Sequence, residues 1–154
     1  MRLSLKKSVG NISNIHFKGN NIKRAFDLQE SKVSVKNIRS TGPDTYKEFV
    51  YMIHNASLDI SQATFKGTTI LNTDEKNPNP LIYGLLSAKS LNMENILFDG
   101  VKPSLDSKPT NIIDVDADVT LKDLSIKNCN FSRPLNSYRL DKWKYHNGQC
   151  QYPW

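Results

Sequence analysis

A chain of 154 residues with 38% hydrophobic and 23% charged residues is typical of a single domain that buries a core. No apolar run approaches the roughly 18 residues that span a bilayer, and the basic start MRLSLKKSVGN lacks the apolar stretch of a signal peptide. These features leave open a cytosolic protein, export by another route, or a piece of a longer chain. The net charge of +6 favours an acidic partner such as a nucleic acid, an anionic glycan or an acidic protein. However, the Lys residues are scattered and no nucleic-acid motif occurs, so a well-solvated surface is the simpler explanation.

One ten-residue pattern recurs five times along the chain. Its first positions alternate apolar and polar residues, which is the period of a half-buried strand. Asn, Gln or Asp follows at position five, and apolar residues return at positions six and eight. In chain order, the copies are GNISNIHFKG from Gly10, VSVKNIRSTG from Val33, LDISQATFKG from Leu58, LNMENILFDG from Leu91 and VTLKDLSIKN from Val119.

Position five of the pattern predicts a turn, because the alternation breaks there and Asn or Asp adopts a left-handed backbone at low cost. A second short strand should follow and end at the Gly or Asn of position ten. The residues expected to stack at this turn are Asn14, Asn37, Gln62, Asn95 and Asp123.

An apolar segment precedes each of the last four copies, at residues 25–28, 49–53, 81–86 and 111–115. Each repeat therefore predicts several short strands and no helix. Repeats of this kind predict a coil of parallel strands in which neighbouring turns lie about 4.8 Å apart. Phe17, Phe65, Phe98 and Ile126 should form one column inside the coil.

Over residues 9–128 these repeats resemble those of right-handed parallel β-helix proteins, the architecture of pectate lyases, polygalacturonases and phage tailspikes. The resemblance rests on the recurring pattern and on the asparagine-like residues at its turn. It implies an all-β fold, with a right-handed parallel β-helix (a solenoid) of about five rungs at residues 1–131 and an irregular capping tail at residues 132–154. It implies no activity, because the fold hosts both enzymes and inert spacers.

The catalytic motifs of the resembled enzymes are missing: the chain has no Gly-His-Gly, no Asp-Asp pair and no Arg-Ile-Lys. The segment DVDAD places Asp114, Asp116 and Asp118 at alternating positions, which would face the same way on one strand. Three such carboxylates can bind a hard cation such as calcium. A solvated outer strand face explains the same pattern, and we expect no other cofactor.

Insertions and the tail offer the candidate binding surface. The segments 43–48, 68–80 and 101–110 all follow position ten, so they should leave the same edge of the coil, which is often the binding face of a repeat protein. The tail holds Lys142, Trp143, Lys144 and Tyr145, which suit a cap, a ligand surface, or both. Cys129 and Cys150 fit no zinc pattern; they either form a disulfide or are two separate thiols.

Three functions remain open. The first is a non-catalytic module that recognises a glycan or a protein through the loop edge and the aromatic, basic tail. The second is a small polysaccharide lyase or hydrolase that uses Asp114, Asp116 and Asp118. The third is a basic effector or toxin domain with an acidic protein partner. The missing catalytic motifs favour the first.

Overall fold

Parallel β-strands make up the regular secondary structure of the described residues. The computed structural model describes residues 2–18, 21–71, 80–85, 87–104, 111–129, 133–137, 144–146 and 149–150, and this part contains no helix. Every strand pair in it is parallel. The all-β prediction with parallel strands is therefore confirmed.

Two sheets contain all of these strands. Sheet A has eight strands: β1 (Leu3–Lys6), β3 (Asn21–Gln29), β5 (Thr45–Ile53), β7 (Thr69–Ile70), β8 (Ile82–Leu85), β10 (Lys102–Pro103), β11 (Asn111–Val115) and β13 (Arg133–Ser137). Sheet B has seven: β2 (Val9–Phe17), β4 (Lys32–Thr41), β6 (Ser57–Lys66), β9 (Ser90–Asp99), β12 (Asp118–Lys127), β14 (Lys144–His146) and β15 (Gln149–Cys150).

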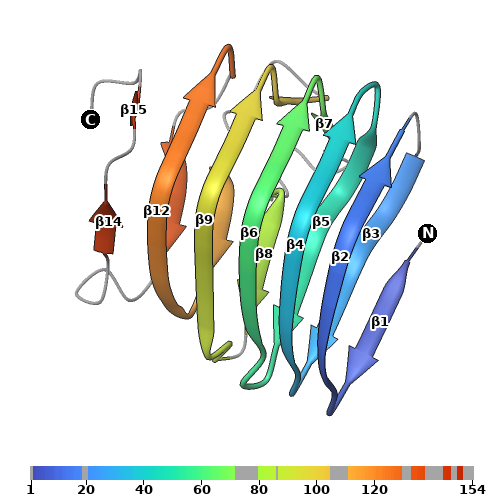
Figure 1. The fold of residues 1–154 in the computed structure, drawn as a ribbon, viewed down its shortest axis with the longest axis vertical. Coiled ribbons are helices and arrows are strands. Elements are labelled where there is room, and N and C mark those ends of the chain that lie inside the picture. Colours follow the sequence, from blue (N-terminus) through green and yellow to red (C-terminus); the bar gives the residue numbers. More distant parts are fainter. Residues whose placement is uncertain are drawn as a thin grey trace.

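The chain passes back and forth between the two sheets. It runs from β1 into β2, returns to β3, and repeats this passage to the C-terminal strands, so neighbours in a sheet come from successive repeats (Figure 1). Consecutive strands lie in opposite sheets except at β7–β8, β10–β11 and β14–β15, where both strands belong to one sheet. The five copies of the sequence pattern are β2, β4, β6, β9 and β12, which lie next to one another in sheet B.

The register of sheet B matches the alignment of the repeats. Val35 pairs with Ile60, and Ile60 pairs with Met93, so position three of each copy lies beside position three of the next. Position five has the expected left-handed backbone in all copies, with φ angles of 58°, 57°, 59°, 56° and 52° at Asn14, Asn37, Gln62, Asn95 and Asp123. These residues bend each strand without ending it, so the two short strands predicted per copy are one continuous strand.

The core lies between the two sheets and contains the predicted column. Phe65 and Phe98 are fully buried and stacked, with ring centroids 5.2 Å apart and planes inclined by 18°. Phe17 and Ile126 lie at the same register position on β2 and β12 and are also buried. Ser40 occupies this column on β4, where a polar side chain replaces the apolar one.

Segment 43–48 is not an insertion, contrary to the sequence prediction. Thr45 begins β5, and Asp44, Tyr46 and Glu48 are buried. The polar residues of this segment led to its prediction as a loop. Ser40, however, is hydrogen-bonded to both Asp44 and Tyr46, and Arg24 is hydrogen-bonded to Glu48. Because these groups find partners, their polar side chains can be buried within or next to a strand.

The other two insertions interrupt sheet A at one common place. The short strands β7 and β10 pair in line with the start of β5, through Thr69 beside Thr45 and Lys102 beside Thr69. The sheet resumes at β8 and β11, where Ile82 lies beside both Val50 of β5 and Ile113 of β11. Residues 72–79 and 105–110, which separate these parts, lie outside the described residues.

The described parts of the tail continue both sheets. β13 pairs in parallel with β11, while β14 and β15 pair in parallel with β12. The tail, expected as an irregular cap over residues 132–154, thus contributes one more layer of strands to each sheet.

Candidate functional site

The predicted tail site is only partly placed. Lys142 and Trp143 lie outside the described residues. Lys144 and Tyr145 belong to β14, with their backbones beside Thr120 and Leu121 of β12. The binding role of these four residues therefore stays a prediction.

The three predicted carboxylates do not share one strand. Asp114 lies on β11 of sheet A and Asp118 begins β12 of sheet B, with Asp116 at the bend between them. The Asp116 carboxylate accepts a hydrogen bond from the backbone amide of Ser87 at 3.2 Å. Val115 and Ala117, which alternate with the three carboxylates, are both fully buried. Among the described residues, no group of three or more His, Cys, Asp or Glu side chains is arranged to hold a metal ion.

The outer surface of sheet A carries a different cluster, which we call the tyrosine face. One residue from each of four adjacent strands forms its central row: Asp27 lies beside Tyr51, Tyr51 beside Tyr83, and Tyr83 beside Asp114. All four are half-buried, and the rings of Tyr51 and Tyr83 are 6.0 Å apart and tilted by 48°. The row thus places two aromatic rings between two carboxylates. Arg24 and Glu48, which lie beside each other on β3 and β5, complete the face.

Arg24 fixes one end of the tyrosine face. Its Nε donates to Glu48 Oε2 at 2.8 Å, and its guanidinium lies 3.8 Å from the centre of the Tyr51 ring. Asp27 Oδ2 forms ion pairs with two arginines, with Arg24 Nη1 at 3.7 Å and with Arg2 Nη2 at 2.5 Å. Burial opposes the charge of Arg24, but the hydrogen bond and charge of Glu48, aided by Asp27, raise its pKa above the usual value. Arg24 therefore stays charged and holds the Tyr51 ring in place.

The chemistry of this face suits a ligand with both hydroxyl groups and apolar ring faces. Aromatic side chains offer flat apolar surface together with a polar hydroxyl. Carboxylates accept hydrogen bonds and a guanidinium donates them in a fixed geometry. The two insertions leave sheet A between the strand positions of Tyr46 and Val50, so they begin close to Glu48 and Tyr51.

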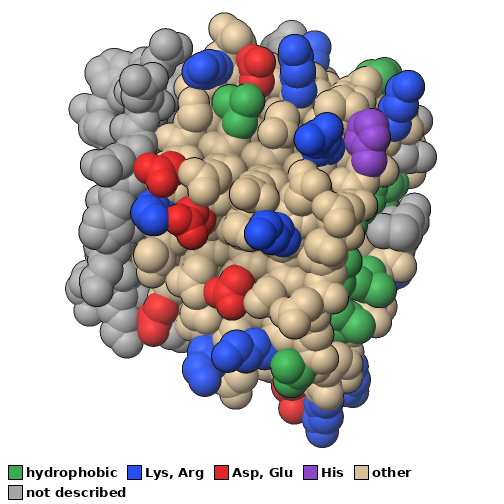
Figure 2. Space-filling model, in the orientation of Figure 1, with side chains coloured by type: hydrophobic (Ala, Val, Ile, Leu, Met, Phe, Trp, Pro, Cys, Tyr) green, Lys and Arg blue, Asp and Glu red, His purple; other side chains and the backbone are tan. Residues whose placement is uncertain are grey.

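The outer surface of sheet B is of another kind. Uncharged polar side chains cover most of it, with scattered charges of both signs (Figure 2). Several of these side chains satisfy one another: Asn92 donates to Asp59 at 2.5 Å, and Lys122 donates to Glu94 at 2.5 Å. Two hollows of about 320 and 360 Å³ lie on this surface, but no Phe, Tyr or Trp ring of β2, β4, β6, β9 or β12 faces outward, so it is the weaker candidate.

A buried polar cluster inside the fold is excluded as a binding site. The Ser40 hydroxyl lies within 2.7 Å of Asp44 Oδ2, 3.1 Å of the Tyr46 hydroxyl and 3.2 Å of Thr68 Oγ1. All four residues are fully buried, and burial raises the pKa of the Tyr46 phenol. With no access for a ligand, the cluster joins neighbouring strands.

Sequence reasoning missed the tyrosine face. Tyr51 and Tyr83 sit within the apolar segments FVYMI and LIYGLL, which read as core strands throughout. Alignment of these segments by their apolar residues would have revealed the row, since Asp27, Tyr51, Tyr83 and Asp114 then occupy one position. A polar or amphipathic residue recurring between buried neighbours marks the outward side of a strand.

No protein-family model, no curated protein and no solved structure matches this chain. Within the described part, no helix is long and apolar enough to cross a membrane.

Proposed function

We propose that this chain is a right-handed parallel β-helix that acts as a non-catalytic module and recognises a glycan through the tyrosine face. The alternation of strands between two parallel sheets supports the coil, and the strong preference of parallel crossover connections for the right hand supports its handedness. The observation that carries the function is the row of Tyr51 and Tyr83 between Asp27 and Asp114.

Sugar rings match this row because their apolar faces can stack on the tyrosines while their hydroxyls reach the carboxylates and Arg24. A lyase or hydrolase that uses Asp114, Asp116 and Asp118 is less well supported, since these residues are divided between two sheets and the bend that joins them.

A glycan array followed by calorimetric titration of the best-binding oligosaccharide tests the proposal. Tyr51→Ala and Tyr83→Ala should each weaken binding about tenfold or more, because a central aromatic contact in an interface commonly contributes 2 kcal/mol or so. Leu97→Ala, which removes an outward apolar side chain from sheet B, is the matched control and should bind as the parent does.

Two results would overturn the proposal. One is equal loss of binding in Leu97→Ala and the tyrosine variants, which would place the site elsewhere. The other is release of new reducing ends or unsaturated products from the bound oligosaccharide, which would make the protein an enzyme.

A further inference from the structure

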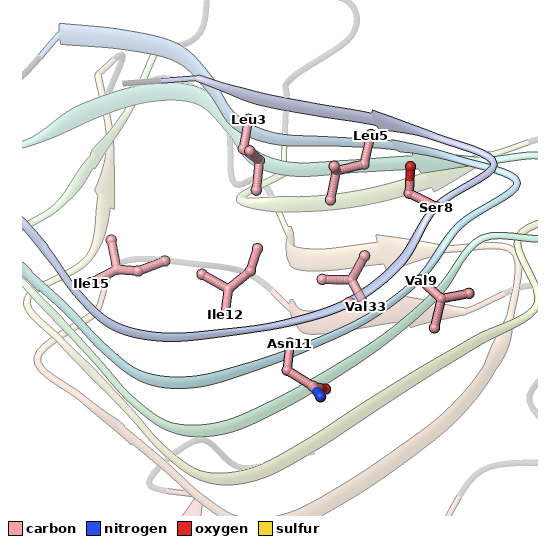
Figure 3. A pocket seen from close by; sticks show the side chains of 9 residues that line it. Leu3, Leu5, Ser8, Val9, Asn11, Ile12, Ile15 and Val33 are labelled. Atoms are coloured by element: carbon pink, nitrogen blue, oxygen red, sulfur yellow. The ribbon is translucent and has the colours of Figure 1, made fainter.

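The N-terminal end of the molecule carries an open apolar cavity. β1 pairs only with β3 and β2 only with β4 among the described strands, so each has one edge without a neighbouring strand. Between these edges lies a cavity of about 390 Å³, into which Leu3 and Leu5 point from one sheet and Ile12 and Ile15 from the other (Figure 3). Val9 at its rim is 86% exposed and is the one large hydrophobic residue exposed in the described part of the chain.

The edge of β2 suits the addition of a strand. Open edges present backbone donors and acceptors that pair readily with another extended chain. β2 spans Val9–Phe17, long enough for a full strand partner, and its inward residues already line the cavity. A strand that paired with β2 would place every second side chain into that cavity, as in other cases of peptide recognition by strand addition.

The positive charge of this end indicates which kind of strand would bind to β2. Residues 1–18, which contain β1, β2 and the turn between them, carry four Lys and Arg and no Asp or Glu, so they hold +4 of the chain's net charge of +6. Lys and Arg side chains gather at the lower corner of the molecule beside β1 and β2 (Figure 2). Lys6 is exposed on β1, and Lys7 at the adjoining turn lies 3.8 Å from Glu30. Because a second copy would bring the same positive charges together, the end disfavours self-pairing and favours an acidic partner.

We propose that the β1–β2 end binds an extended acidic segment of another protein, which pairs with β2 and places alternate apolar side chains into the cavity. This site is separate from the tyrosine face and does not depend on glycan binding.

The probe is a fluorescently labelled ten-residue peptide in which valine and glutamate alternate. Fluorescence anisotropy should show saturable binding, and amide NMR shifts should change at β1 and β2. The peptide with lysine in place of glutamate, and the glutamate peptide with methylated backbone nitrogens, should bind at least about tenfold more weakly, because they lack the charge and the backbone donors respectively.

Variants of the protein separate the two contributions. Lys6→Glu should weaken binding of the glutamate peptide by about threefold to tenfold, as expected for reversal of one exposed charge. Val9→Ser should weaken it without changing thermal stability, because Val9 is exposed. Lys66→Glu, an exposed lysine on β6, is the control with equal charge change and should bind as the parent does.

Three outcomes would overturn the inference. Equal binding of the lysine and glutamate peptides would remove the charge argument. Shift changes confined to other strands would place the site elsewhere. A dimer in sedimentation velocity that Val9→Ser dissociates would show that a second copy occupies this end.

Discussion

Replacing Phe98 with Ala tests the column that holds the two sheets together. Phe98 is fully buried and its ring stacks on Phe65 at 5.2 Å. Truncation of a buried Phe commonly costs about 3–5 kcal/mol, and a stacked aromatic pair adds about 0.5–1.5 kcal/mol beyond the area it buries. We therefore expect a loss of about 4–5 kcal/mol in the free energy of unfolding. For a chain of this size, that corresponds to a fall in Tm of roughly 8–20 °C.

Circular dichroism during thermal and urea unfolding measures this loss. Leu97→Ala is the internal control, because Leu97 is the next residue along β9 but faces outward and is half-buried. Its variant should lose no more than about 1 kcal/mol. If Phe98→Ala unfolds within about 3 °C of the parent, or if both variants lose equal stability, the stacked column does not stabilise the fold as argued.

Four further predictions address the turn, the buried polar cluster and the thiol. Asn37→Ala should lower the free energy of unfolding by about 1–2 kcal/mol, because Asn37 has a φ of 57° and donates a hydrogen bond to Asn14 at 2.7 Å. Asn37→Gly should lower it less, because glycine adopts a positive φ without strain. Equal unfolding curves for the two variants would contradict this. Ser40→Ala should cost about 1–3 kcal/mol in urea unfolding because its three buried partners lose a hydrogen bond, a loss that the outward Ser61→Ala should not show. In a Cys150→Ser background, Cys129 should react with iodoacetamide only after urea unfolds the chain, because the thiol is free and buried; rapid reaction of the folded protein would disprove its burial. Burial also raises the pKa of this thiol, so stability should be intact below the ordinary thiol pKa near 8.5 and fall as pH rises above it, which urea unfolding at a series of pH values would measure.

Sheet B was predictable because local chemistry and global fold agree there. Each copy combines a two-residue alternation with Asn, Gln or Asp at the bend, and the structure has a positive φ at every one of these residues. Gly67 and Gly100 end their strands with φ angles of 64° and 67°, as the pattern at position ten predicts. When the backbone preference of the bend residue and the apolar alternation indicate the same strand, the pairing register of the sheet follows from the sequence.

The bends at which the chain passes from sheet A to sheet B could not be predicted in this way. Lys7, Glu30 and Ser87 also have positive φ angles, of 51°, 49° and 59°, although these residue types do not favour such a backbone. Tertiary pairing holds them there: the Lys7 amide donates to Gln29 O at 3.0 Å, and the Glu30 amide donates to His54 O at 3.0 Å. Contacts between residues far apart in the sequence leave no local signal.

The candidate site was hidden for a related reason. The rows of a parallel sheet bring together single residues from successive repeats, and sheet A has no recurring motif to align them. Asp27 and Tyr83 are 56 positions apart in the sequence, yet only one strand separates them in the sheet. The segment at 43–48 was expected to be a loop because it is polar. Its Asp44 and Glu48 are instead hydrogen-bonded to Ser40 and Arg24, and residue types alone do not reveal these contacts.

The common place at which the insertions interrupt sheet A gives the two sheets different tolerances to change. Sheet B runs without a break through five strands of nine or ten residues, so it can hold the spacing of the repeats by itself. Sheet A opens at one register position, between β7 and β8 and again between β10 and β11. Residues added to a connection at that point cost little chain entropy, because each doubling of a connection's length costs only about 0.6 kcal/mol. Mutation can thus lengthen, shorten or exchange these segments while the remaining framework keeps its shape, which makes this edge the part of the molecule most open to the evolution or engineering of new specificities.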